Sequence, residues 1–245
     1  MSENETIEEI AAGEEPNEAE PEAADHEAGA ERELTPEEQE RLEELREKRR
    51  EALAQVRTFG DPVLKSRASE VTEFGPHLDA EAERMFDLMH DALGIGLAAT
   101  QLGSMRRMLV FQAGPDAEPR AIVNPEIEWL SDDLVTAEEG CLSLPGITVD
   151  VERPLHARVS AQGTAGERLL LEASGLEARV LQHEIDHLDG VLILDRTERE
   201  QRRGAIRALR NEGSFSPEML EPGYGEDEPE AGDGDTRGDD PDGER

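Results

Sequence analysis

The sequence contains a single cysteine, Cys141, among its 245 residues, so the chain cannot form an internal disulfide. Aromatic residues make up only 3% of it, and no apolar run approaches the roughly 18 residues of a membrane-spanning helix. The first Lys or Arg is Arg32, so the chain begins without the positive region of a signal peptide or the arginine-rich face of a transit peptide. These absences predict a soluble, cytoplasmic protein in a reducing compartment, with no membrane partner.

Basic residues are also scarce, because 25 Lys and Arg stand against 60 Asp and Glu, for a net charge of -35. Such acidity argues against nucleic-acid binding by the whole surface, and we expect no DNA partner. The two ends carry most of the charge and too few apolar residues to form a core. We therefore predict three regions: an acidic, disordered or helical extension at 1–54, a folded domain at 55–211 and an acidic disordered tail at 212–245.

Periodicity within this frame predicts an α+β domain. A capping box at Thr35 to Glu38 predicts a solvated helix running to about Val56. Further helices are expected at Asp79 to Ala92, Leu176 to Leu188 and Arg196 to Arg210. Short strands are expected at Met108 to Gln112, Ile122 to Asn124, Val149 to Val151 and Val191 to Leu194, with a hairpin formed by His156 to Ala161 and Arg168 to Glu172. The expected fold is a set of small mixed or antiparallel sheets packed around a central helix.

The strongest chemical signal is the sequence His183-Glu184-Ile185-Asp186-His187. On a helix, His183 and His187 lie on one face and can bind the same metal ion, while Glu184 beside them can serve as a general base. A catalytic metal site usually has three protein ligands and one open position. The third ligand is left open by the spacing alone: Cys141, a carboxylate or another histidine would each serve.

Each signal also has a structural interpretation. Two histidines on a helix can be ordinary surface residues, and a lone cysteine is commonly a small buried apolar residue. The segment from Gly94 to Gly103 can be a glycine-rich turn packed on the core, with Gln101 as an ordinary polar residue. It is not a phosphate-binding loop, because no Gly-Lys-Ser/Thr sequence follows it.

Taken together, three segments resemble the peptide deformylase family. Its Gly-x-Gly-x-Ala-Ala-x-Gln, Glu-Gly-Cys-Leu-Ser and Gln-His-Glu-x-Asp-His motifs correspond, in order, to Gly94 to Gln101, Glu139 to Ser143 and Gln182 to His187. The stretch from Arg57 to Leu64 also resembles the start of the family domain. The likeness spans about Val56 to Arg210 and leaves only the two acidic ends unexplained.

The resemblance implies one divalent metal ion per chain, bound by Cys141, His183 and His187, and no other cofactor. The family's usual metal is Fe²⁺, and Zn²⁺, Ni²⁺ or Co²⁺ can replace it; this ligand set does not decide between them. The implied reaction is hydrolysis of the N-formyl group from the N-terminal methionine of a newly synthesised polypeptide, which releases formate.

Within that reaction the resemblance gives roles to further residues. Glu184 becomes the acid–base group, and the side-chain amide of Gln101 and the backbone N–H of Leu142 become donors to the oxyanion. Ile95, Gly96 and Gly140 become the backbone that a substrate peptide joins as an added strand. We also expect Leu176, Val180 and His183, which share a helix face, to line a pocket for methionine, although a core position would explain them equally well.

The sequence allows more than one interpretation of the arginine-rich segment and of the overall function. Residues Arg196 to Arg210 are net positive, with arginines three or four apart, which predicts either a solvated helix or a contact with ribosomal RNA near the emerging substrate. The alternatives to a deformylase are a metallopeptidase with the same helix, an inactive relative that binds ribosomes, and a redox sensor built on Cys141. Retention of Gln101, Cys141, Glu184 and both histidines favours the deformylase.

Overall fold

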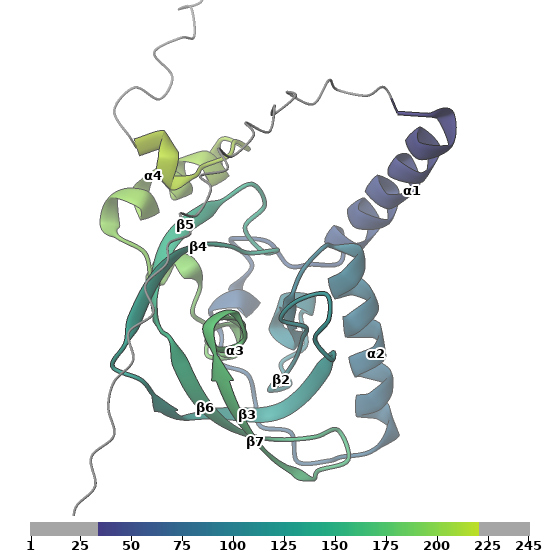
Figure 1. Ribbon diagram of the computed structural model, residues 1–245, viewed down its shortest axis with the longest axis vertical. Coiled ribbons are helices and arrows are strands. Elements are labelled where there is room, and N and C mark those ends of the chain that lie inside the picture. Colours follow the sequence, from purple (N-terminus) through teal and green to yellow (C-terminus); the bar gives the residue numbers. More distant parts are fainter. Residues whose placement is uncertain (1–33, 221–245) are drawn as a thin grey trace, which may run out of the picture.

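The computed structural model describes residues 34–220 (Figure 1). The predictions of disorder for residues 1–33 and 221–245 lie outside the described residues. Within residues 34–220, no helix combines the length and the apolar character needed to cross a membrane.

Seven strands form two small sheets within the described residues. The larger has the order β1-β2-β3-β6-β7, and the smaller pairs β4 with β5. Every pairing between these strands is antiparallel, which confirms the predicted class of small sheets. The bounds are β1 Gly96–Ala98, β2 Met108–Phe111, β3 Arg120–Leu130, β4 Leu134–Gly140, β5 Thr148–Pro154, β6 His156–Gln162 and β7 Arg168–Ser174.

The sequence predicted some of these strands better than others. The β6–β7 hairpin is confirmed, but β3 is far longer than Ile122 to Asn124, and β1 lies where only a turn was expected. The outer half of β3 is largely exposed, so it lacks the apolar alternation that marks a strand with one buried face. The strand expected at Val191 to Leu194 is wrong, because a short 3₁₀ helix occupies Ile193–Asp195.

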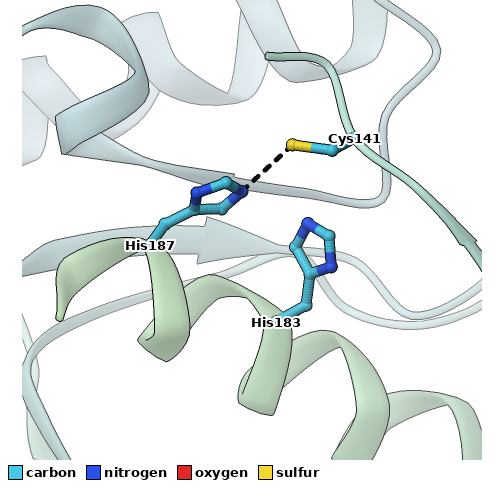
Figure 2. Close-up of side chains that lie close together, drawn as sticks. All are labelled: Cys141, His183 and His187. Carbon is cyan, nitrogen blue, oxygen red and sulfur yellow. Dashed lines mark hydrogen bonds between the residues drawn. The ribbon is translucent and has the colours of Figure 1, made fainter. Parts of the chain in front are cut away.

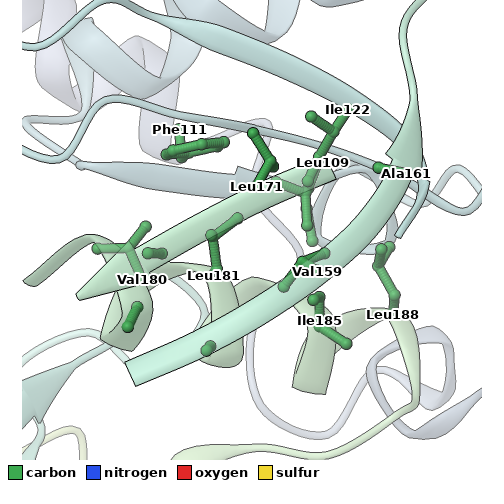
Figure 3. Packing of buried hydrophobic residues seen from close by; sticks show 14 of the residues in the cluster. Leu109, Phe111, Ile122, Val159, Ala161, Leu171, Val180, Leu181, Ile185 and Leu188 are labelled. Atoms are coloured by element: carbon green, nitrogen blue, oxygen red, sulfur yellow. The ribbon is translucent and has the colours of Figure 1, made fainter. Parts of the chain in front are cut away.

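Helix α3 (Gly175–Leu188) lies at the centre of the fold, with strands of both sheets around it (Figure 1). Its apolar side packs on the inner face of the larger sheet, where Leu181, Ile185 and Leu188 join Leu109 and Val159 in one cluster (Figure 3). Burial of this face fixes the rotation of the helix, and therefore the direction in which its polar side chains point.

Helix α2 (Pro76–Asp91) covers a second part of the core. It begins three residues earlier than predicted because Pro76 is accommodated in the first turn. Leu78, Ala82, Met85 and Met89 are buried along one side of it, against Leu97 and Val110 among others.

Helix α1 (Pro36–Leu53) has the predicted capping box, with Thr35 and Glu38 each bonding the other's backbone N–H. Its last turn, however, is not fully solvated as the sequence predicted. Ala52 is buried and Leu53 packs against the same cluster as α2. The extension is therefore attached to the folded domain through its C-terminal turn.

Helix α4 (Arg199–Arg210) packs on a third cluster with β5. It is shorter than the predicted Arg196 to Arg210, because Arg196 lies before it and bonds Asp186 instead. The packed region also extends past residue 211. Phe215 is 6% exposed, its backbone bonds Gly146 and Thr148, and its ring leaves no space for a side chain at Gly204.

This packing predicts that Phe215→Ala will destabilise the folded domain by about 3–5 kcal/mol, because it leaves a cavity between α4 and the third cluster. Leu220→Ala is the matched control, since Leu220 is 42% exposed and should cost little. Chemical denaturation of both variants checks this. Equal stability of Phe215→Ala and the parent chain would show that the segment after residue 211 contributes nothing to the fold.

Candidate metal and catalytic site

Helix α3 places the three polar residues of the His-Glu-x-x-His motif at the inner end of a cavity. His183 and His187 lie one turn apart, with ring centroids 4.9 Å from each other. The His183 side chain is 13% exposed and His187 is 1% exposed. Gly190 follows the end of α3 with φ +74°. A side chain at this position would collide with the backbone of Lys65, so no larger residue fits there.

Cys141 reaches the two histidines from the first residue after β4. Its Sγ lies 3.2 Å from His187 Nε2, and Figure 2 shows the thiol pointing toward both rings. One donor atom from each of Cys141, His183 and His187 lies within 4.8 Å of the others. The spacing of the sequence left the third ligand open, and the structure brings Cys141 to that place.

The protonation of these groups fits a bound cation. Burial, together with the nearby charge of His183, lowers the pKa of His187 well below its usual value, so its ring stays neutral as metal binding requires. Burial also lowers the pKa of His183, but hydrogen bonds to Cys141 and Glu139 outweigh this effect and raise it to about 10.

Glu139, which the sequence motifs did not indicate as a site residue, orients His183. Its Oε2 lies 3.0 Å from His183 Nδ1. A carboxylate can only accept, so Nδ1 donates and Nε2 is directed toward the metal position. Burial raises the pKa of Glu139, but the hydrogen bonds from His183 and Arg153 outweigh it and lower the pKa to about 2. The carboxylate is therefore charged throughout the neutral range.

The buried Arg153 and the half-buried Arg179 hold Glu139 in place. Arg153 donates from Nε and Nη2 to the two carboxylate oxygens at 2.6 and 2.9 Å, and Arg179 donates from Nη1 at 2.6 Å. Arg153 also donates to Asp186 at 2.8 Å, and Asp186 in turn accepts from Arg196. This network joins β4, β5 and α3. The one available signal in the sequence was the two-residue period of β5, where Arg153 continues the buried side of Val149 and Val151.

Glu184 lies beside the metal-binding groups and is 4% exposed. Burial raises its pKa to about 7, against the lowering effect of His183 and Arg153. Its Oε2 is buried and bonds no other described residue, so the chain leaves a hydrogen-bonding position of this carboxylate unfilled. A β-carbon at Gly96 would lie 2.3 Å from Glu184 Oε1, which means that only glycine leaves room for this carboxylate.

Gln101 lies in the 3₁₀ helix Ala99–Leu102, and hydrogen bonds fix the orientation of its side-chain amide. Its Oε1 accepts from the Ala98 N–H at 2.8 Å, so Nε2 is turned toward Ser143 Oγ at 3.3 Å and Cys141 Sγ at 3.7 Å. Within the described residues, the backbone N–H of Leu142 donates to no other group. The Gln101 amide is therefore directed toward Cys141, and Leu142, the next residue in the chain, has a backbone donor that no described residue uses.

A cavity of about 530 Å³ opens onto this arrangement. Eight of the nine predicted site residues line it, and His187 lies buried behind them. Leu176 and Val180 line it together with His183, as the shared helix face predicted. A larger hollow of about 810 Å³ lies elsewhere, around Arg67 and Asn124, and contains none of the predicted residues.

Comparison with known proteins identifies the family. The sequence profile of the polypeptide deformylase family matches residues 53–203. The chain belongs to the peptide deformylase family. It is 43% identical to peptide deformylase 1 of Corynebacterium glutamicum over 167 residues, which cover 67% of this chain and 99% of that protein. It is 48% identical to the peptide deformylase of Thermotoga maritima over 141 residues, 58% of this chain and 85% of the other.

Solved structures agree with this assignment. The Thermotoga maritima peptide deformylase matches with 47% identity and a TM-score of 0.57, over 58% of this chain and 96% of that one. Arabidopsis thaliana peptide deformylase 1B in complex with an inhibitor matches with 36% identity and a TM-score of 0.62, over 64% and 88% of the two chains. The α+β fold and the deformylase resemblance are both confirmed. The chain is a hydrolase that removes the N-formyl group from new polypeptides, in a metal-dependent family.

The Glu139 contacts predict that Glu139→Gln will weaken metal binding by about 10- to 100-fold, because His183 loses its charged orienting partner. Affinity is measured by competition with a chromophoric chelator. Glu138→Gln is the matched control, since Glu138 is the neighbouring exposed residue of β4. Equal metal affinity of the two variants would contradict the orienting role.

The close approach at Gly96 predicts that Gly96→Ala will slow formate release about 100-fold while metal stays bound, because Glu184 must move. The double variant with Glu184→Gln should be no slower than Glu184→Gln alone. Fully additive losses would mean that the new methyl group acts on something other than Glu184.

Proposed function

We propose that this chain deformylates nascent polypeptides with one divalent metal ion held by Cys141, His183 and His187. The observation that carries this proposal is the convergence of a thiol and two imidazoles, one of them kept neutral, at the inner end of the cavity. When bound there, the metal would supply the positive charge that polarises a water molecule and the formyl carbonyl.

For the metal we propose Fe²⁺, which the family resemblance favours. One thiolate with two imidazoles also suits Zn²⁺, Ni²⁺ and Co²⁺. Metal analysis of protein purified without oxygen, together with the activity of each reconstituted form, distinguishes these ions.

Glu184 is proposed as the acid–base group. Its unpaired Oε2 is placed to take the proton from the attacking water and to deliver it later to the amine that leaves. Burial disfavours the charged carboxylate, so Glu184 can hold a proton between the two steps.

Gln101 and Leu142 are proposed to stabilise the oxygen of the formyl group as negative charge develops on it. The Gln101 amide is already fixed by Ala98, so it need not reorganise during the reaction. The Leu142 N–H would donate from the backbone beside Cys141.

The substrate backbone is proposed to lie along Ile95, Gly96 and Gly140. Strand β1 is an edge of the larger sheet and Gly140 ends β4 in the smaller one, so an extended peptide can join them as an added strand. Leu176 and Val180 would then contact the methionine side chain.

Formate release from a formyl-methionyl peptide tests this proposal directly. Glu184→Gln should lower turnover by about 100- to 10,000-fold with metal content unchanged. Glu177→Gln is the control, because Glu177 lies on the same helix outside the cavity. Full activity of the Glu184 variant, or no formate from the metal-loaded parent chain, would overturn it.

We propose a second partner, ribosomal RNA, for helix α4. Arg203, Arg207 and Arg210 surround a surface hollow of about 290 Å³ and pair with no other described residue. An unpaired cationic face of this kind suits the phosphates of ribosomal RNA, close to where the substrate emerges. Arg196, bonded to Asp186, does not belong to this face.

Replacing Arg203, Arg207 and Arg210 by Gln should weaken co-sedimentation with ribosomes at low salt and leave hydrolysis of a short formyl peptide intact. The matched control replaces Arg41, Arg46 and Arg50 of α1. Loss in both variants, or in neither, would contradict a specific contact between α4 and ribosomal RNA.

A further inference from the structure

The wall of the catalytic cavity includes two residues of α1, Arg49 and Leu53. They are four residues apart, so they lie on the same face of the helix. Leu53 packs into the cluster that also holds Leu142, and the side chain of Gln55 bonds Arg84 of α2 at 3.0 Å. The C-terminal end of α1 is thus fixed against the domain at the cavity, where it meets α2 (Figure 1).

Arg49 is the unpaired cation of this wall. Its neighbours Arg46 and Arg50 pair with Glu43 and Glu47 on the same helix. Arg49 is exposed and makes no hydrogen bond or ion pair with another residue of the 34–220 region. The other arginine of the cavity, Arg179, is bound to Glu139 at 2.6 Å.

The position of Arg49 determines which part of a substrate it can meet. The formyl group is expected at the buried end, beside Cys141 and Glu184. Arg49 is exposed, so it lies toward the open side, where the peptide continues after its methionine. A guanidinium presents a fork of donors that matches a carboxylate, and it acts here on a chain whose net charge of -35 otherwise repels acidic peptides.

We propose that Arg49 is a specificity-determining residue that favours formyl-methionyl peptides with an acidic side chain within the first few positions after methionine. This inference rests on the proposed deformylase function. Residue 49 precedes the stretch matched by the family profile, so the preference would be a property of the α1 extension. Glu138 is the other exposed, unpaired charge of the wall and opposes the effect, so the test depends on the change at Arg49 and not on the absolute preference.

The test uses formyl-methionyl tetrapeptide amides that carry Glu, Gln or Lys at the second, third or fourth position. The quantity measured is the ratio of kcat/KM for the Glu peptide to that for the Gln peptide, at low salt, so a general loss of activity cancels. In Arg49→Gln this ratio should fall about two- to fivefold at one position, through KM, as expected for one exposed ion pair. In Arg49→Glu, the Lys peptide should have a higher kcat/KM than the Glu peptide at that position.

Arg50→Gln is the matched control, because Arg50 lies on the same helix outside the cavity. The difference between the parent chain and Arg49→Gln should also shrink as salt is added. Equal ratios in the parent chain and Arg49→Gln at every position, or an equal fall in Arg50→Gln, would overturn the inference. Failure of the metal-loaded parent chain to release formate from the Gln peptide would instead reject the proposed function itself.

Discussion

The buried carboxylate of Glu139 is the group on which the site depends. It accepts from Arg153 of β5 and from Arg179 and His183 of α3, so these contacts fix β4 relative to both elements. A charge in this position is tolerated only because it is fully paired; removing one partner of such a buried pair commonly costs about 3–5 kcal/mol. The network is therefore a constraint on geometry more than a source of stability.

That constraint explains how distant segments form one site. Glu139 lies two residues before Cys141, so fixing its side chain against α3 also brings the thiol to the two histidines. Asp186 extends the network along the same helix to Arg153 and Arg196. On the opposite side, Gly96 leaves room for Glu184, and Ala98 orients Gln101. The cavity thus has a rigid polar end, with α1 contributing part of its wall.

The sequence predicted those features that local patterns encode. The spacing of His183, Glu184 and His187 indicated a metal-binding helix face, and the capping box and hairpin were correct. It could not locate Glu139 as an orienting group, because that contact joins strands and a helix far apart in the chain. Strand β1 was missed because three residues are too few for a period to show, and the packing of Phe215 was hidden by the acidic composition around it.

The most direct test of this account is the ligand set of the metal itself. X-ray absorption at the metal edge of the loaded protein should show one sulfur and two imidazole nitrogen ligands, and the sulfur contribution should vanish in Cys141→Ser. A metal bound only by nitrogen and oxygen in the parent chain would contradict the convergence of Cys141, His183 and His187 on one ion.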